Sequence, residues 1–296
     1  MAAITVSTLS KGSNFDPKLV KDLITKVQGK SALAKLSGQI PVAFTGTKEM
    51  VFDMPNGIDI VAENGAKSHG GATVDPVVIT PIKFEYGARI SDEFLYASEE
   101  EQLNILESFN DGFAKKVAEG LDIAAMHGIN PRSGSASTVV GNNNLDSKVS
   151  QTVTTTSAVD DNLQSAIGLV QGSGYDVTGI ALAPTFATSL GNVKANGVPL
   201  YPEFRFGQAP ENFAGNAIDV NRTVATADNA IVGDFENYFK WGIAKEIPVE
   251  IIPYGDPDNS GSDLKGHNQI YVRAEVYLGW GILVPTAFAR VIPASN

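Results

Sequence analysis

The stretch that decides the fold lies near the end of the chain and reads NQIYVRAEVYLGWGILVPTAFARVI over residues 268–292. From Gln269 to Ile282, apolar side chains occupy every second position. This alternation predicts a strand with one buried face. The predicted strand is about 43 Å long at about 3.3 Å per residue, whereas most strands have about 5–6 residues.

A second long element is predicted over residues 98–128. Ser98 and Glu101 form a capping box, and apolar residues recur every three or four positions along the segment. The helix from Glu99 to His127 is about 43 Å long at about 1.5 Å per residue. A compact domain of this size is only about 40 Å across. A helix and a strand of this length, lying side by side, suit a building tile better than an enzyme.

Residues 46–90 predict a long β-hairpin. Two extended segments, around 48–54 and 77–91, flank a turn-rich stretch that contains the pairs Asn56-Gly57 and Asn64-Gly65. The hairpin has too few large apolar residues for a core of its own, and a two-stranded ribbon is marginal alone in water. We expect it to lie on the rest of its subunit or on a neighbour.

The remaining segments predict an arm and a second domain. The first 45 residues read as an arm with an amphipathic helix over 16–28, and residues 131–157 as a loop with short strands. The second domain combines a helix opened by Asp160 and Asp161, a buried strand, and a helix that begins at Pro184. It continues with a buried strand, a turn and a hairpin up to residue 252, so the whole is mixed α+β.

The composition excludes several classes of protein. The chain has 296 residues, a net charge of -11 and no cysteine. Disulfides, zinc-thiolate sites and cysteine nucleophiles are therefore excluded. The acidic balance argues against binding to a nucleic-acid backbone. The beginning of the chain lacks the basic and apolar regions of a signal peptide, and no apolar run suits a membrane span. We expect no membrane contact and a cytoplasmic site of synthesis.

No catalytic, cofactor-binding or metal site is predicted. The sequence lacks a nucleophile elbow, a Walker A loop and a dinucleotide-binding glycine motif. The three histidines, His69, His127 and His267, fall in a hairpin tip, a helix end and a loop, so a zinc site is not expected.

Two other motifs favour ordinary structural roles. Asp256, Asp258, Ser260 and Gly261 match the first half of a calcium-binding EF-hand loop, but His267 stands where a bidentate glutamate belongs. We interpret this motif as a solvated turn. An aromatic set is interpreted as sheet core and not as a ligand cage: Phe235, Tyr238, Phe239 and Trp241.

Four motifs in this order resemble those of a known family, the major capsid proteins of tailed bacteriophages. These proteins have the Hong Kong 97-type fold, which encapsulin shells share. The motifs are PIKFEYGARISDEFL (81–95), EEEQLNILESFNDGFAKKVAEGLDIAAMHG (99–128), IVGDFENYFKWGIAKEIPVEI (231–251) and the opening stretch (268–292).

The resemblance implies an α+β capsid fold with an N-terminal arm, an extended β-hairpin loop, a long spine helix on a long-stranded sheet, and a mixed α/β axial domain. The implied parts are the arm (1–45), the extended loop (46–90), the peripheral domain (91–157) with its spine helix (98–128), the axial domain (158–254) and a return to the peripheral domain (255–296).

The resemblance also implies a function and partners. Copies would assemble into hexamers and pentamers of an icosahedral head shell around the DNA genome, without sequence-specific nucleic-acid binding. In the family the extended loop lies over an adjacent subunit. Because the arm starts almost at Met1, a separate scaffolding protein is expected, together with a portal and an optional decoration protein. The protein would be part of the virion, assembled in the host bacterial cytoplasm.

Some members of the family join subunits through a lysine–asparagine bond promoted by a glutamate. Lys67, Asn268 and Glu275 are the candidate set here, although we favour ordinary polar roles for all three. Other hypotheses remain open: an encapsulin-type nanocompartment shell protein, a β-rich phage tail or decoration protein and, as the weakest, an enzyme with a dispersed carboxylate site.

Overall fold

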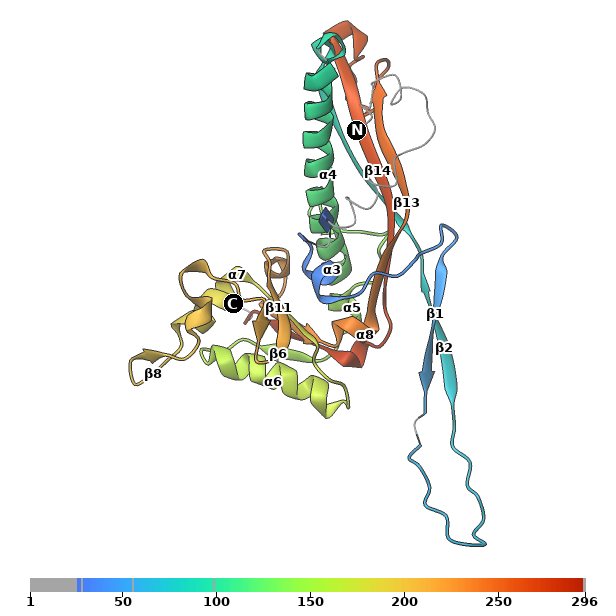
Figure 1. Ribbon diagram of the computed structural model, residues 1–296, viewed down its shortest axis with the longest axis vertical. Coiled ribbons are helices and arrows are strands. Elements are labelled where there is room, and N and C mark those ends of the chain that lie inside the picture. Colours follow the sequence, from blue (N-terminus) through green and yellow to red (C-terminus); the bar gives the residue numbers. More distant parts are fainter. Residues whose placement is uncertain (1–25, 28, 55, 98, 295–296) are drawn as a thin grey trace.

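The computed structural model describes residues 26–27, 29–54, 56–97 and 99–294. A long helix and long strands run side by side, a layered α/β unit lies at one end of them, and a thin β-hairpin projects from the body (Figure 1). The predicted helix over 16–28 and the proposed cap Ser98 fall almost entirely outside the described residues. Only Lys26 and Val27 of that segment are described, and both are helical.

The long rods of the spine are confirmed. Helix α4 spans Glu99–His127, 29 residues, and strand β14 spans Gln269–Ile282, 14 residues. The apolar face of α4 that includes Phe113, Val117 and Leu121 is buried in the main core. Figure 1 shows the helix running along β14 for most of the length of the body.

Strand β14 is the middle strand of an antiparallel sheet with the order β13-β14-β3, in which β13 spans Phe239–Ile252 and β3 spans Ile82–Ser91. The predicted hairpin before residue 252 is wrong, because 239–252 is one continuous strand of 14 residues. Register shifts between Ile243 and Lys245 and between Ile247 and Glu250 keep the pairing with β14 going. Bulges of this kind accommodate Pro248, which has no N–H to donate.

The prediction that β14 buries only one face is also wrong: on the face expected to be exposed, Tyr271 and Glu275 are buried in the first half of the strand. Gly279 and Gly281 lie on the face expected to be exposed, yet both are buried. A Cβ atom on either glycine would lie within 3.0 Å of the Ile79 side chain. The base of the projecting hairpin therefore rests on this face, and the two glycines permit the close approach.

The projecting hairpin is the pair β1 (Thr47–Asp53) and β2 (Thr73–Ile79), in antiparallel register. Its second predicted segment, 77–91, divides at Thr80 and Pro81: the part before them belongs to the hairpin and the part after them to the spine sheet as β3. Residues 54–72 join β1 and β2, and their described part contains no helix or strand. The hairpin is thus attached to the spine at its base alone (Figure 1).

The α/β unit contains a mixed six-stranded sheet. Its order is β10 (Asn212–Phe213), β11 (Asn216–Val220), β7 (Gly179–Leu182), β12 (Ala230–Gly233), β15 (Phe288–Ile292) and β6 (Thr152–Thr154). Strands β7 and β12 are wholly buried. Helices α6 (Val159–Gly172) and α7 (Pro184–Asn192) confirm the predicted helices of this region.

Short elements complete the chain. They are α3 (Ala32–Leu36), η1 (Asp92–Tyr96), β4 (Ile129–Asn130), β5 (Ser135–Ala136), α5 (Leu145–Lys148), β8 (Lys194–Ala195), β9 (Val198–Pro199), η2 (Pro202–Gly207), η3 (Val224–Thr226), α8 (Phe235–Tyr238), η4 (Lys265–His267) and η5 (Pro285–Ala287). The sequence did not predict α5, although the short strands around it were expected. The aromatic set is core as predicted: Phe235, Phe239 and Trp241 are fully buried, and Tyr238 packs against them partly exposed.

Candidate subunit-contact surface

The hairpin carries a set of apolar side chains that the described part of the chain leaves exposed. We call this set the hairpin surface: Met50, Phe52, Met54, Ile58, Ile60, Val61, Val74 and Val78, each at least 44% exposed. Ile58 and Ile60 are 99% and 97% exposed. Large contiguous apolar patches are rare on monomers and mark sites of interaction.

Both strands of the hairpin lack a buried face. The residues of β1 are all exposed or half-buried, and in β2 only Ile79, at the base, is buried. Since a two-stranded ribbon is marginal alone in water, the hairpin needs a surface that the described residues do not provide. This confirms the inference that the hairpin has no core of its own.

Two further exposed apolar patches lie at the other projecting ends. At the start of α4, Leu95, Tyr96 and Ile105 are exposed beside an open depression of about 690 Å³. At the β8–β9 hairpin, Val198 and Leu200 are exposed, and nearby Phe206 is 91% exposed. Each of the three ends of the molecule in Figure 1 therefore presents apolar side chains to its surroundings. A tile that contacts neighbours on several sides needs such a distribution.

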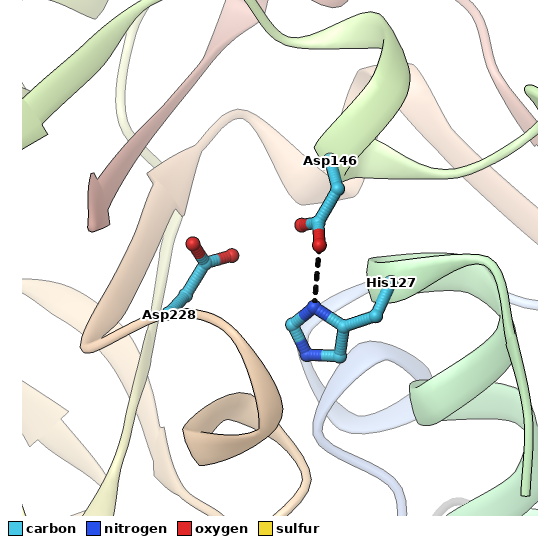
Figure 2. A group of neighbouring side chains, drawn as sticks. All are labelled: His127, Asp146 and Asp228. Atoms are coloured by element: carbon cyan, nitrogen blue, oxygen red, sulfur yellow. Dashed lines mark hydrogen bonds and ion pairs between the residues drawn. The ribbon is translucent and has the colours of Figure 1, made fainter. Parts of the chain in front are cut away.

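The junction between the spine helix and the six-stranded sheet is polar. His127 at the end of α4 contacts Asp146 through Nδ1 at 3.0 Å (Figure 2). Its Nε2 lies 3.0 Å from the carbonyl oxygen of Thr223. Arg290 on β15 donates to both oxygens of Asp228, at 3.0 and 2.8 Å, and lies 2.8 Å from Oδ1 of Asp146. We call His127, Asp146, Asp228 and Arg290 the junction cluster.

The junction cluster does not fit a metal site, although the potential ligand atoms of His127, Asp146 and Asp228 lie within 4.8 Å of one another. Both ring nitrogens of His127 already have partners, and the guanidinium of Arg290 supplies the positive charge between the two carboxylates. Burial raises the pKa of Asp228 to about 6, and the hydrogen bonds from Arg290 oppose this rise. The cluster therefore acts as a structural ion network that holds the two parts together.

A second buried carboxylate attaches the arm to the spine. Asp122 on α4 is fully buried and accepts hydrogen bonds from the hydroxyl of Ser31 at 2.5 Å and from the backbone N–H groups of Ala32 at 2.8 Å and Leu33 at 3.1 Å. The hydroxyl of Thr223 donates to the same carboxylate at 3.0 Å. Asp122 thus binds the first N–H groups of helix α3, which have no partner inside that helix. Burial raises the pKa of Asp122 to about 6, against the effect of these hydrogen bonds.

The candidate calcium motif forms a turn, as predicted, but it is not merely solvated. Asp256, Asp258 and Ser260 converge on the side chain of Arg89, which comes from β3. The sequence did not predict the contribution of Arg89, because it lies far away in the chain. The other two histidines considered as zinc ligands, His69 and His267, are exposed and lie apart from the junction cluster.

The candidate cross-linking residues are not brought together within one chain. Lys67 lies in the segment that joins β1 and β2, and Asn268 immediately precedes β14; Figure 1 places these segments at opposite ends of the molecule. Glu275 is buried on β14 and pairs with Lys83 at 2.6 Å and with Arg273 at 3.5 Å. Lys83, the nearest lysine partner of Glu275, was not predicted from the sequence.

In the part of the chain that the structure describes, none of the helices has the length and apolar character of a membrane span.

Comparisons with known proteins agree with this arrangement. The model of the Phage capsid family matches residues 15–291. A solved chain of Mycobacterium phage Ogopogo is 30% identical, with a TM-score of 0.77 over 99% of this chain and 100% of that chain. A chain of Gordonia phage Cozz is 25% identical, with a TM-score of 0.75 over 90% of this chain and 87% of that chain.

A more distant chain has the same fold. It is described as "Capsid of empty GTA particle computed with C5 symmetry", and it is 15% identical, with a TM-score of 0.63 over 90% of each chain. None of the curated proteins matches. The family match over most of the chain, together with the spine and the projecting hairpin, leads to one conclusion: the chain belongs to the phage capsid family and is a shell-forming capsid protein.

Proposed function

We propose that copies of this chain form the hexamers and pentamers of an icosahedral head shell that encloses the DNA genome of a tailed bacteriophage. The observation that carries the proposal is the hairpin surface, which is apolar, projects from the body and is left exposed by the residues that the structure describes. A neighbouring copy of the same tile would supply its cover. Because such a contact joins different surfaces of the two copies, it generates rings when the rotation closes.

The proposal includes a division of labour along the chain. Residues 1–45 would be the arm, 46–90 the extended loop, 91–157 with 255–296 the peripheral domain, and 158–254 the axial domain. A separate scaffolding protein, a portal and an optional decoration protein would assist assembly in the host cytoplasm. The role is structural, without catalysis. A nanocompartment shell and a tail protein are less favoured, because the chain matches the phage capsid family and resembles solved chains of two phages and of a GTA capsid.

The test is assembly of the purified full chain, with and without scaffolding protein, followed by negative-stain electron microscopy. The wild-type chain should form closed particles or capsomer rings. A double variant of the hairpin surface, Met50→Ser with Phe52→Ser, should keep the melting temperature of the unassembled chain, since both side chains are more than half exposed. The same variant should lose assembly.

A matched control is Val139→Ser, which changes an apolar side chain that is 72% exposed outside the hairpin surface. This variant should assemble like the wild type. Particles at wild-type yield from the hairpin variant would contradict the proposal that the hairpin binds a neighbouring copy. A monodisperse monomer from the wild type under every condition, scaffold included, would contradict the shell itself.

A further inference from the structure

The loop that joins β13 to β14 is built around a cation that comes from the chain itself. It spans residues 253–268 and closes the spine sheet at the end that lies away from the α/β unit (Figure 1). Its interior is ordered: Leu264 is fully buried, and its backbone N–H donates to the carbonyl oxygen of Gly255 at 2.9 Å. A loop of this length, whose one regular element is the short η4, needs another source of order.

One nitrogen atom supplies that order. Nη2 of Arg89 lies 2.7 Å from Oδ1 of Asp256, 2.5 Å from Oδ1 of Asp258 and 2.5 Å from Oγ of Ser260. The same nitrogen donates to the backbone carbonyl oxygen of Ser262 at 2.8 Å. Nε of Arg89 donates to the second oxygen of Asp258 at 2.9 Å. Four oxygen atoms of one short segment therefore surround a single nitrogen of the guanidinium, which shares its positive charge with the other two nitrogens.

The order of these oxygen atoms along the chain is that of a calcium loop. In an EF-hand, the side chains of the first, third and fifth positions and the backbone carbonyl of the seventh bind Ca²⁺, with glycine at the sixth. With Asp256 as the first position, Asp258 is the third, Ser260 the fifth and Ser262 the seventh. Gly261 is the sixth and has a φ of +81°. The distances of 2.5–2.8 Å to Nη2 are close to the calcium–oxygen distances of about 2.3–2.6 Å.

The loop departs from an EF-hand at the twelfth position, where a calcium loop has the negative charge of a glutamate. The twelfth position is His267, whose Nδ1 lies 2.8 Å from the carbonyl oxygen of Asp263, so no bidentate carboxylate closes the shell of ligands. A guanidinium needs less negative charge than a divalent ion, and two carboxylates are sufficient to pair with it. The Arg89 guanidinium also holds the pKa of Asp258 well below its usual range.

We propose that Arg89 is the resident cation of this loop: its guanidinium occupies the place that Ca²⁺ takes in a loop of this type, so the end of the spine folds without any divalent metal. Arg89 stands opposite Tyr271 in the register of β3 and β14, so the backbone of Arg89 is held in the spine sheet. Truncation of Arg89 leaves an oxygen-lined site with two uncompensated carboxylates, which is the chemistry that Ca²⁺ binds. The inference concerns the folding of one loop and does not depend on the proposed shell.

The test uses the full chain and three variants: Arg89→Ala, the double variant Arg89→Ala with Asp258→Asn, and Arg222→Ala. Arg222 is the matched control, because its side chain is 82% exposed and has an ion pair with Glu119 at 2.9 Å. Melting temperatures are measured in EDTA, in Ca²⁺ and in Mg²⁺, and calcium binding is measured by titration calorimetry.

For the wild type, the melting temperature in EDTA should equal that in Ca²⁺, and the same should hold for Arg222→Ala. Arg89→Ala should melt lower than the wild type in EDTA, and saturating Ca²⁺ should raise its melting temperature by at least about 2 °C with a stoichiometry near one. The double variant should lose this response. Mg²⁺ should act more weakly, because it prefers a rigid octahedral set of ligands.

Three results would overturn the proposal. They are a wild-type melting temperature that falls in EDTA, an Arg89→Ala variant as stable as the wild type, and a destabilised Arg89→Ala variant with no response to Ca²⁺. If Arg89→Ala does not fold during expression, Arg89→Gln replaces it. That variant keeps the length of the side chain in part and removes its charge, and the same response to Ca²⁺ is expected of it.

Discussion

The buried carboxylate of Asp122 should make the stability of the chain depend on pH. Its pKa is raised from 3.8 to about 6 in the folded chain, chiefly by burial. The folded state therefore holds a proton more tightly than the unfolded state. As pH falls through 6, protonation removes the cost of burying the charge, so the free energy of unfolding rises.

The size of this effect follows from the two pKa values. For a group at about 6 when folded and 3.8 when unfolded, the linkage relation gives a gain of about 1.4 kcal/mol between about pH 7.5 and about pH 5, and about 3 kcal/mol over the full range. Asp122→Asn cannot titrate and should lose this gain. Asn also offers a single acceptor oxygen to the four donors that now bind the carboxylate.

The assay is urea denaturation at several pH values, with the hairpin variant Met50→Ser and Phe52→Ser as background, so that assembly does not contribute. The measured quantity is the difference in the pH dependence of unfolding between this background chain and the same chain carrying Asp122→Asn. Asp111→Asn is the matched control, because Asp111 lies on the same helix with its side chain 62% exposed. Equal pH dependence with and without the Asp122 carboxylate would refute the reasoning, whereas other titrating groups cancel in the comparison.

Three other perturbations have defined outcomes. Arg290→Met should lower the free energy of unfolding, measured in urea, by about 3–5 kcal/mol, since Asp228 would stay buried without its partner. A loss below about 1 kcal/mol would contradict the stabilising role of the junction cluster. Burial raises the pKa of Glu246 to about 7, and its Oε2 has no hydrogen-bond partner among the described residues; Glu246→Gln should therefore raise the melting temperature more at pH 8 than at pH 6, and a shift independent of pH would count against this. If Lys67 forms no cross-link, boiled particles of the wild type and of Lys67→Arg should both give one band near 31.2 kDa on a denaturing gel, and a ladder in the wild type alone would show the bond.

The elements with long, regular patterns were predictable. The bounds of α4 match the predicted Glu99–His127, and β14 covers the predicted alternation. A pattern that repeats over many turns leaves no competing assignment. The same patterns were misleading about burial, because alternation along β14 indicated one buried face. Glycine has no polar or apolar side chain, so Gly279 and Gly281 gave no sign that Ile79 covers the other face.

The failure at residues 239–252 has a tertiary cause. Proline in a sheet is confined to edge strands and bulges, and β13, which contains Pro248, is an edge strand. The strand continues because β14 offers a partner of the same length, and pairing resumes after the register shifts between Ile243 and Lys245 and between Ile247 and Glu250, the second of which contains Pro248. The local sequence indicates only the conformation that the segment favours by itself, whereas pairing with the long strand β14 makes residues 239–252 a single strand.

The polar sites were not predictable, because their members are far apart in the sequence. His127 meets Asp146 and Thr223 only after the spine helix has packed on the sheet, and Arg290 arrives from the last strand. The oxygen-bearing residues from Asp256 were recognised as half of a calcium loop, but the cation that completes them is Arg89, from a strand on the other side of the spine sheet's central strand. A motif identifies ligands and leaves open which charge they bind.

The distribution of polar and apolar contacts suits a subunit that keeps its own shape while the geometry of its contacts with neighbouring copies varies. Inside the subunit, directional contacts fix the joints: Asp122 holds the arm, the junction cluster holds the sheet, and Arg89 holds the end of the spine. At the three projecting ends large apolar side chains are exposed. Apolar contact is non-directional, so it tolerates small changes in the angle between tiles, whereas a misplaced buried charge does not. A shell that uses one chain in several environments needs rigid joints within each copy and adaptable contacts between copies.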